Sequence, residues 1–533
     1  MDKAFEMGKT SATGSFQLLI GVATSTIIMA AGALILGKLL TSDELGLYGI
    51  VLVPSTLINL VRDWGINSAM TKYIATLRAS DKDEEIHDVI IAGLTFEVAS
   101  GLALSFLSLL LASFIATFAF HRPESARYIA IVSVSIISGA LLAASQAGFV
   151  GFERMRLYSF TQICQSIVKV AVGITLVILG YGVLGAVIGY TLSYVAAAFI
   201  GLATFYFLLI RPLRRKATRN SITKTLRTML NYGVPLSIAS ILGGVLAQIY
   251  AFMIIPLTTN AMYGNYTIAL YFSVLLTFVT TPIATVLFPA FAKLDPHNEH
   301  ELLKNVFASS VKYASILLVP FTMAIMVLSG PMIGTLYGGK YPYGPFFLTL
   351  YVISNLFVVF GSLSSGSLLS GLGETNILMI QSIITLVIGI PLGVVLIPIL
   401  GITGLIIATI VSGVPSMFWG LYWIWKHYEA KADFKSSAKI LAASAIAAIL
   451  AYLPTIFLNT AYWIKLVIGL IIFLAAYIFG APIIGAVSLT DINNLRTMFS
   501  SMTILSKIIN IPLKAAEKTA RIKSANKKAQ EKH

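Results

Sequence analysis

Four ionisable side chains lie inside long apolar stretches of this sequence, where a charge is costly: Arg62, Asp63, Glu97 and Lys169. A charge at the centre of a lipid bilayer costs about 2.5–3.5 kcal/mol on insertion scales, so such residues usually contact a ligand or one another. A guanidinium can hold a phosphate through two parallel hydrogen bonds, and an ammonium acts on the same group as a point charge. The two cations therefore fit the binding of an anion within a membrane.

Polar neighbours at helical spacing accompany both cations. Asn59 and Arg62 share one face of a predicted helix, and Gln162, Gln165 and Lys169 form a polar stripe on another. These stripes predict a hydrated cavity whose cations are concentrated in the first half of the chain. The second half offers weaker, uncharged candidates for the cavity lining, which are Gln248, Asn355 and Gln381.

The four charges permit three interpretations. In the first, Arg62 and Lys169 contact an anionic ligand. In the second, they only neutralise Asp63 and Glu97 inside the protein. In the third, the two carboxylates bind a proton or Na⁺ that couples transport to an ion gradient. No motif implies a resident cofactor or a metal, and no nucleotide-binding loop is present in the sequence.

The composition indicates that lipid is the solvent around these residues. Of the 533 residues, 57% are hydrophobic and 11% are charged, whereas soluble proteins carry about 25% charged residues. Fourteen apolar stretches are long enough to cross a bilayer, which predicts an all-α integral membrane protein with fourteen transmembrane helices. The predicted spans are 15–40, 45–75, 88–119, 128–150, 157–180, 183–210, 232–257, 265–291, 306–330, 344–371, 376–398, 400–425, 437–458 and 462–487.

The distribution of Lys and Arg predicts the orientation of these spans. With the N-terminus inside, thirty of the 37 cations fall on the cytoplasmic side and five on the outer side. Both termini are therefore expected in the cytoplasm. The net charge of +15 is explained by this asymmetry and by contact with anionic membrane lipids, so nucleic acid is not an expected partner.

An internal repeat organises the spans. The pattern Thr-x-x-x-x-Gly-x-Tyr at Thr41 returns one residue longer at Thr258, and Gly182-x-x-Gly185 returns at Gly401, both about 218 residues downstream. Two tandem six-helix lobes are thus predicted, followed by two further helices and a basic tail. The predicted domains are 1–218, 219–431, 432–489 and a cytoplasmic tail at 490–533. Duplicated helical bundles of this kind are typical of transporters.

Several stretches also resemble a known family. Residues 37–48, 63–66 and 69–75 resemble the N-terminal signature of prokaryotic polysaccharide and oligosaccharide flippases. Residues 337–341 and 371–375 are similar to landmarks of the second half of these proteins. The flippases are members of the multidrug/oligosaccharidyl-lipid/polysaccharide exporter superfamily, and the similarity covers roughly residues 10–487.

The resemblance implies two six-helix lobes that alternate access to a central cavity. It implies a cargo of oligosaccharide linked to polyprenyl or dolichyl phosphate or pyrophosphate, moved outward across the plasma membrane of a prokaryote for surface glycan synthesis. Arg62 and Lys169 would then contact the phosphate, and glycosyltransferases of the same pathway would be partners. The alternatives are an ion-coupled exporter of drugs or organic cations from the same superfamily and, less favoured, a membrane glycan polymerase. An enzyme is disfavoured because no extramembrane loop is large enough to carry chemistry.

Overall fold

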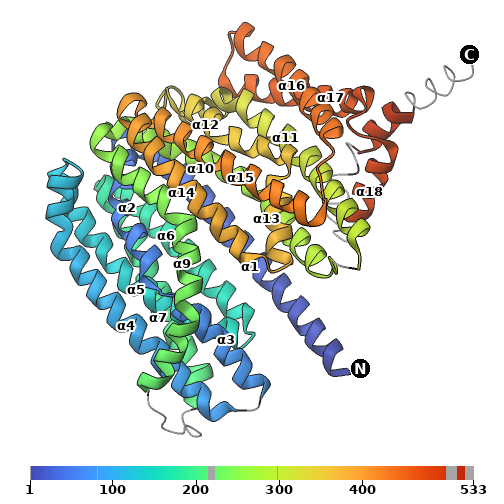
Figure 1. Ribbon diagram of the computed structural model, residues 1–533. Helices are drawn as coiled ribbons and strands as arrows, with labels where there is room; N and C mark the ends of the chain where they lie inside the picture. The colour runs from blue at the N-terminus through green and yellow to red at the C-terminus, as the bar shows by residue number, and fades with distance from the viewer. Residues whose placement is uncertain are drawn as a thin grey trace, which may run out of the picture. The chain divides into compact units, whose positions relative to one another are not determined.

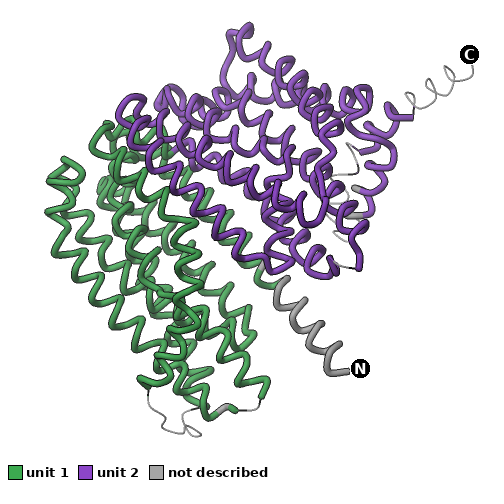
Figure 2. Tube along the Cα trace, viewed as in Figure 1, with its two compact units in different colours: residues 1–267 green, residues 268–533 purple. Residues whose placement is uncertain are grey.

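The computed structural model describes residues 2–80, 82–213, 222–296, 298–499, 510 and 513–521. These residues form helices, turns and loops, and they fall into two compact units, 1–267 and 268–533 (Figure 2). The all-α class predicted from the sequence is confirmed. Much of the predicted basic tail lies outside the described residues. The predicted domains at 1–218, 219–431 and 432–489 stay a prediction.

Most helices of both units are longer than a membrane requires (Figure 1). Unit 1 contains α1 (Asp2–Leu39), α2 (Ser42–Arg62), α3 (Ile66–Ala79), α4 (Asp83–Phe114), α5 (Ala126–Gly151), α6 (Met155–Leu176), α7 (Gly182–Phe205), α8 (Arg211–Leu213), α9 (Ile222–Ile254) and the start of α10 (Asn260–Ala292). Unit 2 contains the rest of α10, then α11 (His300–Tyr337), α12 (Gly344–Val352), α13 (Ser362–Gly371), α14 (Thr375–Leu400), α15 (Ile402–Tyr428), α16 (Phe434–Phe457), α17 (Tyr462–Ile484) and α18 (Leu489–Phe499).

Within the described part of the chain, twelve helical stretches are long and apolar enough to cross a membrane. A thirteenth span results if α12, the 3₁₀ segment η6 (Ile353–Phe360) and α13, bent by 62°, count as one. One of the twelve, Met155–Leu213, has 59 residues and contains the two spans predicted at 157–180 and 183–210. A multi-span membrane protein is therefore confirmed, whereas the number fourteen and the orientation of the termini stay predictions.

The residues of the first repeated signature are explained by helix capping and by helix packing. Thr41 and Glu44 cap α2 reciprocally, because Glu44 N–H donates to the Thr41 hydroxyl at 3.2 Å and Thr41 N–H donates to the Glu44 carboxylate at 2.8 Å. A Cβ on Gly46 would collide with the carbonyl of Asn260 at the start of α10, and one on Gly264 would collide with the backbone of α2. The two copies of the signature thus pack against each other in unit 1, which requires glycine in both.

The second repeated landmark also has the same structure in both copies. Gly182 begins α7 with φ 50° and ψ −129°, and Gly401 precedes α15 with φ 60° and ψ −134°. Only glycine adopts this region without strain. A Cβ on Gly185 would lie 2.8 Å from the backbone of α6, and one on Gly404 would meet the backbone of α14. The four glycines therefore let each helix fold back tightly on its predecessor.

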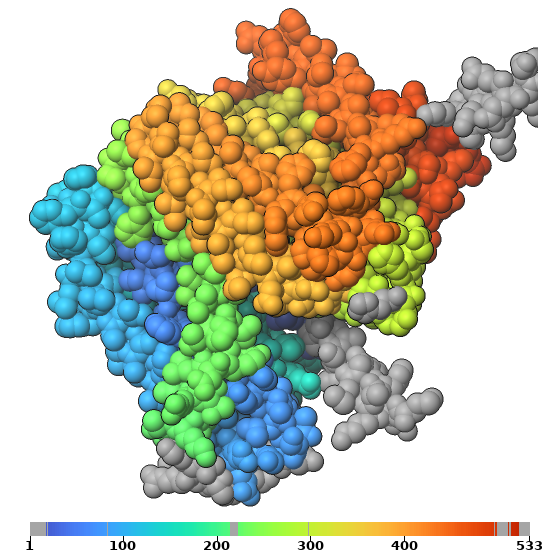
Figure 3. Space-filling model, viewed as in Figure 1, coloured from blue at the N-terminus to red at the C-terminus, as the bar shows by residue number. Residues whose placement is uncertain are grey.

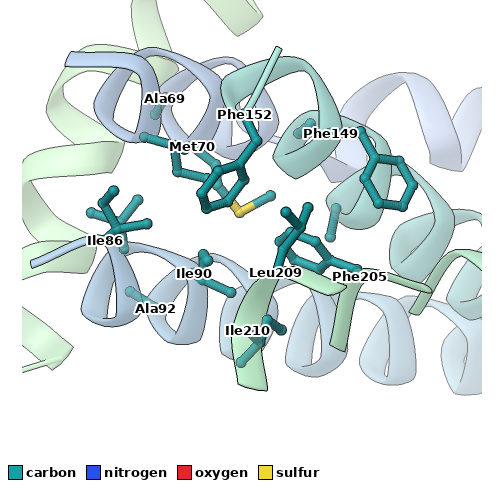
Figure 4. Close-up of a cluster of buried hydrophobic side chains, with 14 of the residues drawn as sticks. Ala69, Met70, Ile86, Ile90, Ala92, Phe149, Phe152, Phe205, Leu209 and Ile210 are labelled. Atoms are coloured by element: carbon teal, nitrogen blue, oxygen red, sulfur yellow. The ribbon is translucent and has the colours of Figure 1, made fainter. Parts of the chain in front are cut away.

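A buried apolar cluster joins α3, α4, α5 and the end of α7 in unit 1 (Figure 4). Met70 and Ile90 are fully buried in it, and the rings of Phe149 and Phe205 meet edge to face with centroids 5.7 Å apart. Met229 of α9 completes the cluster, and α9 also packs against α2. Much of the length of α9 is visible at the surface in the space-filling view (Figure 3). Within unit 1, these contacts hold α2, α3 and α4 in fixed register around the charged residues.

Candidate functional site

An ion pair beside the junction of α2 and α3 gathers three of the predicted site residues. Arg62 is the last residue of α2, and its guanidinium nitrogen lies 2.5 Å from a carboxylate oxygen of Glu97 on α4. Asn67, in the first turn of α3, donates its side-chain amide to Glu97 at 2.8 Å and to Asp63 at 2.6 Å. Asp63 also accepts the backbone N–H of Asn67 at 3.0 Å. Four side chains therefore form one connected network, and Asn67 was not among the predicted members.

This network is closed to its surroundings. Glu97 is 0% exposed and Arg62 is 4% exposed, so both charged groups are shielded from solvent. Removing one partner of a buried ion pair is strongly destabilising, because the other charge is then left buried without a counterion. The arrangement favours the charge-pairing interpretation for Arg62, Asp63 and Glu97 over a free cation at Arg62.

The network still has unused hydrogen-bonding capacity. Among the described residues, the buried Nε of Arg62 and the side-chain oxygens of Asn59 and Asn67 have no partner. Asn59 lies one turn before Arg62 on α2, as the sequence pattern predicts, and faces Gly139 of α5. One donor and two acceptors are thus available beside the pair for a water molecule or for a rearranged partner.

Lys169 has different surroundings from Arg62. Its ammonium lies 5.2 Å from the centre of the Tyr190 ring on α7, and no carboxylate within the described ranges lies at ion-pair distance. Tyr190 packs on Tyr194 with ring centres 5.1 Å apart. The contact between α6 and α7 is close because Gly173 and Gly189 meet with little space for a side chain. Lys169 is therefore a partly buried cation that is stabilised by an aromatic face instead of a countercharge.

The tyrosines beside Lys169 were missed at the sequence level. Tyr190 and Tyr194 are four residues apart, so they share one helical face, and that spacing was an available signal. The position of Tyr190 beside Lys169 could not be predicted in this way, because it depends on how α6 crosses α7. Tyr190 is only 6% exposed, so its ring is a packing partner of Lys169 and Tyr194.

The glutamines of the same stripe are only loosely held. Gln162 donates its side-chain amide to the Tyr158 hydroxyl at 3.4 Å, and Gln165 makes no hydrogen bond within the described residues. Ser166, on the same helix, instead donates to Ser25 of α1 at 3.1 Å. One side of the predicted stripe therefore joins α6 to α1, while Gln162, Gln165 and Lys169 keep free polar groups.

The three polar residues predicted for the second lobe are engaged in helix contacts. Gln248 of α9 accepts the hydroxyl of Thr56 of α2 at 3.0 Å, and both belong to unit 1. Gln381 of α14 donates to the carbonyl of Ser416 of α15 at 2.9 Å. Asn355 of η6 donates to the carbonyl three residues before it, at 3.3 Å. Their predicted role in lining a cavity stays a prediction.

Arg122 is a buried cation whose role the sequence did not reveal. It lies in the loop before α5 and bonds to the segment that links α9 to α10. Its Nε donates to the side chain of Asn260 at 2.6 Å, and its terminal nitrogens donate to the carbonyls of Ile255 (2.6 Å), Phe120 (2.9 Å) and Thr258. Burial lowers the pKa of Arg122, and the carboxylate of Glu124 acts in the opposite direction. Arg122 thus links the loop before α5 to the segment between α9 and α10 by hydrogen bonds.

We expect Arg122→Ala to lower the free energy of unfolding by about 3 kcal/mol, because it strands several buried acceptors. Arg122→Lys should recover only part of this loss, since an ammonium cannot reach four acceptors arranged around a planar guanidinium. The measurement is denaturant unfolding of the full chain in detergent. Arg127→Ala is the matched control, because Arg127 interacts, among the residues that the structure describes, with the ring and hydroxyl of the neighbouring Tyr128 alone. Equal stability of the two alanine variants would contradict the prediction.

An apolar groove of about 540 Å³ runs along α11 and α17 in unit 2. Its lining is almost entirely aliphatic and aromatic, and it includes Ile316, Pro320, Leu328, Leu470, Phe473 and Leu474. The hydroxyl of Tyr477 donates to the Ile316 carbonyl at 3.0 Å, which leaves the groove without a free polar group at that point. Such a lining suits a hydrocarbon chain.

Comparison with solved structures identifies the fold. The fold matches the lipid II flippase MurJ in an inward closed conformation with a TM-score of 0.69 and 17% identity, over 86% of this chain and 97% of MurJ. It also matches an inward-facing multidrug transporter of the MATE family with a TM-score of 0.62 and 16% identity, over 76% and 94% of the two chains. The chain therefore has the fold that these two transporters share.

The sequence match assigns the chain to one family among those that share this fold. Residues 35–343, more than half of the chain, match the family described as polysaccharide biosynthesis protein, and the chain belongs to that family. A stretch of 197 residues is 23% identical to a probable low-salt glycan biosynthesis flippase, Agl15, of Haloferax volcanii. This alignment covers 36% of the chain and 40% of that relative. The resemblance stated from the sequence is confirmed.

Proposed function

We propose that the protein is a flippase that moves an oligosaccharide linked to polyprenyl or dolichyl phosphate or pyrophosphate from the inner to the outer leaflet of a prokaryotic plasma membrane. It works by alternating access, with fourteen spans and both termini in the cytoplasm. The cargo serves the synthesis of surface glycans. Support comes from the family, from the fold, and from the name of the archaeal relative, which is itself described as a probable glycan flippase.

The observation that carries this proposal is the contrast between Lys169 and Arg62. Arg62 forms an ion pair with Glu97. Lys169 instead faces an aromatic ring, and no carboxylate among the described residues compensates its charge. Holding such a charge in a membrane segment costs about 2.5–3.5 kcal/mol, and the cost is offset when an anion arrives. Lys169 is therefore the phosphate-contacting residue, with Gln162 and Gln165 offering further hydrogen bonds. Arg62, Asp63 and Glu97 serve as the buried network that fixes α2, α3 and α4 against one another.

The lipid chain of the cargo needs an apolar path while its headgroup is in a polar site. The groove along α11 and α17 offers such a path within unit 2. Outward movement of the anionic headgroup is also favoured by a cytoplasm at negative potential, by about 2.3 kcal/mol for each charge that crosses 100 mV. The membrane potential can thus contribute to the drive. Coupling to H⁺ or Na⁺ is not required by this scheme.

The export of organic cations is the second candidate, because the matched MATE transporters share the fold. A site for an organic cation needs an available carboxylate in the membrane. Glu97 bonds to Arg62 and Asn67, and Asp63 bonds to Asn67. Neither carboxylate is thus freely available for a cationic ligand in this conformation. The lipid-linked glycan is accordingly the preferred cargo.

A binding panel separates these candidates. The full chain in nanodiscs would be titrated with an undecaprenyl pyrophosphate oligosaccharide, with the same glycan on an uncharged polyprenol, and with an organic cation such as ethidium. We expect saturable binding of the pyrophosphate form and at least about tenfold weaker binding of the uncharged form, the value of one charge-assisted hydrogen bond. Saturable binding of ethidium without binding of the glycan lipid would overturn the proposal.

A further inference from the structure

A second cavity of unit 2 is separate from the apolar groove and has a different lining. It has a volume of about 570 Å³ and lies between α11, α12, α16 and α17. Met323, Met326 and Ala448 line one part of it, whereas Lys465, Tyr452 and Tyr462 line another. The volume falls within the range of small-molecule sites, about 300–1,000 Å³.

The polar and apolar parts of this cavity lie at different levels along the helices. The polar residues come from the ends of helices that meet at one membrane face: Tyr452 and Thr455 near the end of α16, and Tyr462 and Lys465 in the first turn of α17. Met323 precedes Gly330, another lining residue of α11, by seven residues, or about 10 Å along the helix. The cavity therefore has a polar mouth at the interface and an apolar interior toward the bilayer centre.

Lys465 supplies a cation at this mouth. Its ammonium donates one hydrogen bond, to the carbonyl of Thr455 at 3.0 Å, at the C-terminal end of α16. A lysine has three donors, so two remain after this contact. Within the ranges that the structure describes, no carboxylate lies at ion-pair distance from Lys465. The residue can hold an anion without first giving up a countercharge.

Aromatic side chains around the mouth indicate its depth in the membrane. Tyr452 is 49% exposed, Tyr462 is 47% exposed and Phe346 is 53% exposed. Tyrosines with an apolar body and a free hydroxyl are typical of the boundary between headgroups and hydrocarbon. The ring of Tyr462 also packs on Gly334 of α11, so the start of α17 is fixed against α11. The mouth is thus held in place by packing between α17 and α11.

From this arrangement we propose that the cavity binds one anionic phospholipid of the membrane leaflet at that face, with its phosphate on Lys465 and an acyl or isoprenoid chain along Met326 and Ala448. The site is separate from the proposed headgroup site at Lys169, and it does not depend on the identity of the transported cargo. A lipid held there fills the space between the α16–α17 pair and the rest of unit 2. It would stabilise the packing of that pair on α11.

The test is native mass spectrometry of the full chain released from nanodiscs that contain equal amounts of phosphatidylglycerol and phosphatidylcholine. We expect one retained lipid, with about a tenfold preference for phosphatidylglycerol, as one charge-assisted contact provides. Lys465→Gln should abolish the preference. Arg127→Gln is the control, because it removes one cation that lies outside the cavity, in unit 1. Ala448→Phe should remove the retained lipid altogether by filling the interior.

Each outcome decides the proposal. Thermal unfolding of the variants checks that Lys465→Gln and Ala448→Phe remain folded, and a second filling variant, Val327→Phe, replaces Ala448→Phe if the latter does not fold. The proposal is overturned if the wild type retains both lipids equally, if the preference survives Lys465→Gln, or if inorganic phosphate displaces the lipid. Retention of the glycan carrier lipid alone, when it is added to the nanodiscs, would also overturn it.

Discussion

Glu97→Ala is expected to lower the free energy of unfolding by about 3–5 kcal/mol, the usual cost of leaving one partner of a buried ion pair alone. The variant strands the guanidinium of Arg62, which is 4% exposed and has no other carboxylate at ion-pair distance among the described residues. It also removes one of the two acceptors of the Asn67 amide. Denaturant unfolding of the full chain in detergent measures the change.

A control and a double variant make this prediction decisive. Glu301→Ala removes a carboxylate that is paired with Lys304 on the surface of α11, so its cost should stay within about 0.5 kcal/mol. Arg62→Met/Glu97→Leu replaces both charges with apolar groups of similar size and should recover most of the stability. If Glu97→Ala is as stable as Glu301→Ala, the network does not hold α2 against α4.

The double variant also separates the two interpretations of Arg62. If Arg62 only neutralises Glu97, the folded double variant should bind and move cargo about as well as the wild type. If Arg62 contacts the phosphate, the same variant should be stable but inactive. Stability and transport must therefore be measured on the same preparation.

Lys169→Ala is expected to lower the rate of cargo translocation by about 10- to 150-fold, which corresponds to the loss of a charged hydrogen bond worth about 1.5–3 kcal/mol. Its stability should remain near that of the wild type, because no carboxylate within the described ranges depends on Lys169. Lys169→Arg should retain most of the activity, since a guanidinium also binds phosphate and can lie over the Tyr190 ring.

The matched control for this prediction is Lys224→Ala on α9. Lys224 is an exposed cation of the same unit near one end of a span, so its loss changes the net charge equally. The measurement is initial-rate translocation in proteoliposomes with equal protein content. If Lys169→Ala and Lys224→Ala move cargo at the same rate, Lys169 does not contact the headgroup.

The sequence predicted features that depend on local rules or on repetition. The apolar spans and the duplicated Thr, Gly and Tyr positions leave a pattern that can be read along the chain. The structure adds the reason for Gly46 and Gly264, which face each other in unit 1. It also shows that Gly182 and Gly401 share one backbone conformation. These positions repeat because the local geometry repeats.

The partners of the charged residues could not be predicted. Arg62 and Glu97 are 35 residues apart, and their contact depends on how α2 crosses α4. Two of the acceptors of Arg122 are backbone carbonyls more than 130 residues away, and a carbonyl leaves no mark in a sequence. The aromatic partner of Lys169 depends likewise on the crossing of α6 and α7. Helix spacing gives the face of a side chain, but only packing gives its neighbour.

The most direct test of the proposed function is translocation of an undecaprenyl pyrophosphate oligosaccharide in proteoliposomes that contain only this protein. The glycan is incorporated in both leaflets, and its accessibility to an enzyme added outside is followed with time. The proposal predicts that wild-type protein makes the inner pool accessible, that Lys169→Ala does so at least about tenfold more slowly, and that the uncharged polyprenol glycan is moved poorly. No movement of the inner pool by folded wild-type protein, across several carrier lipids and with a membrane potential applied, would contradict the assignment as a flippase.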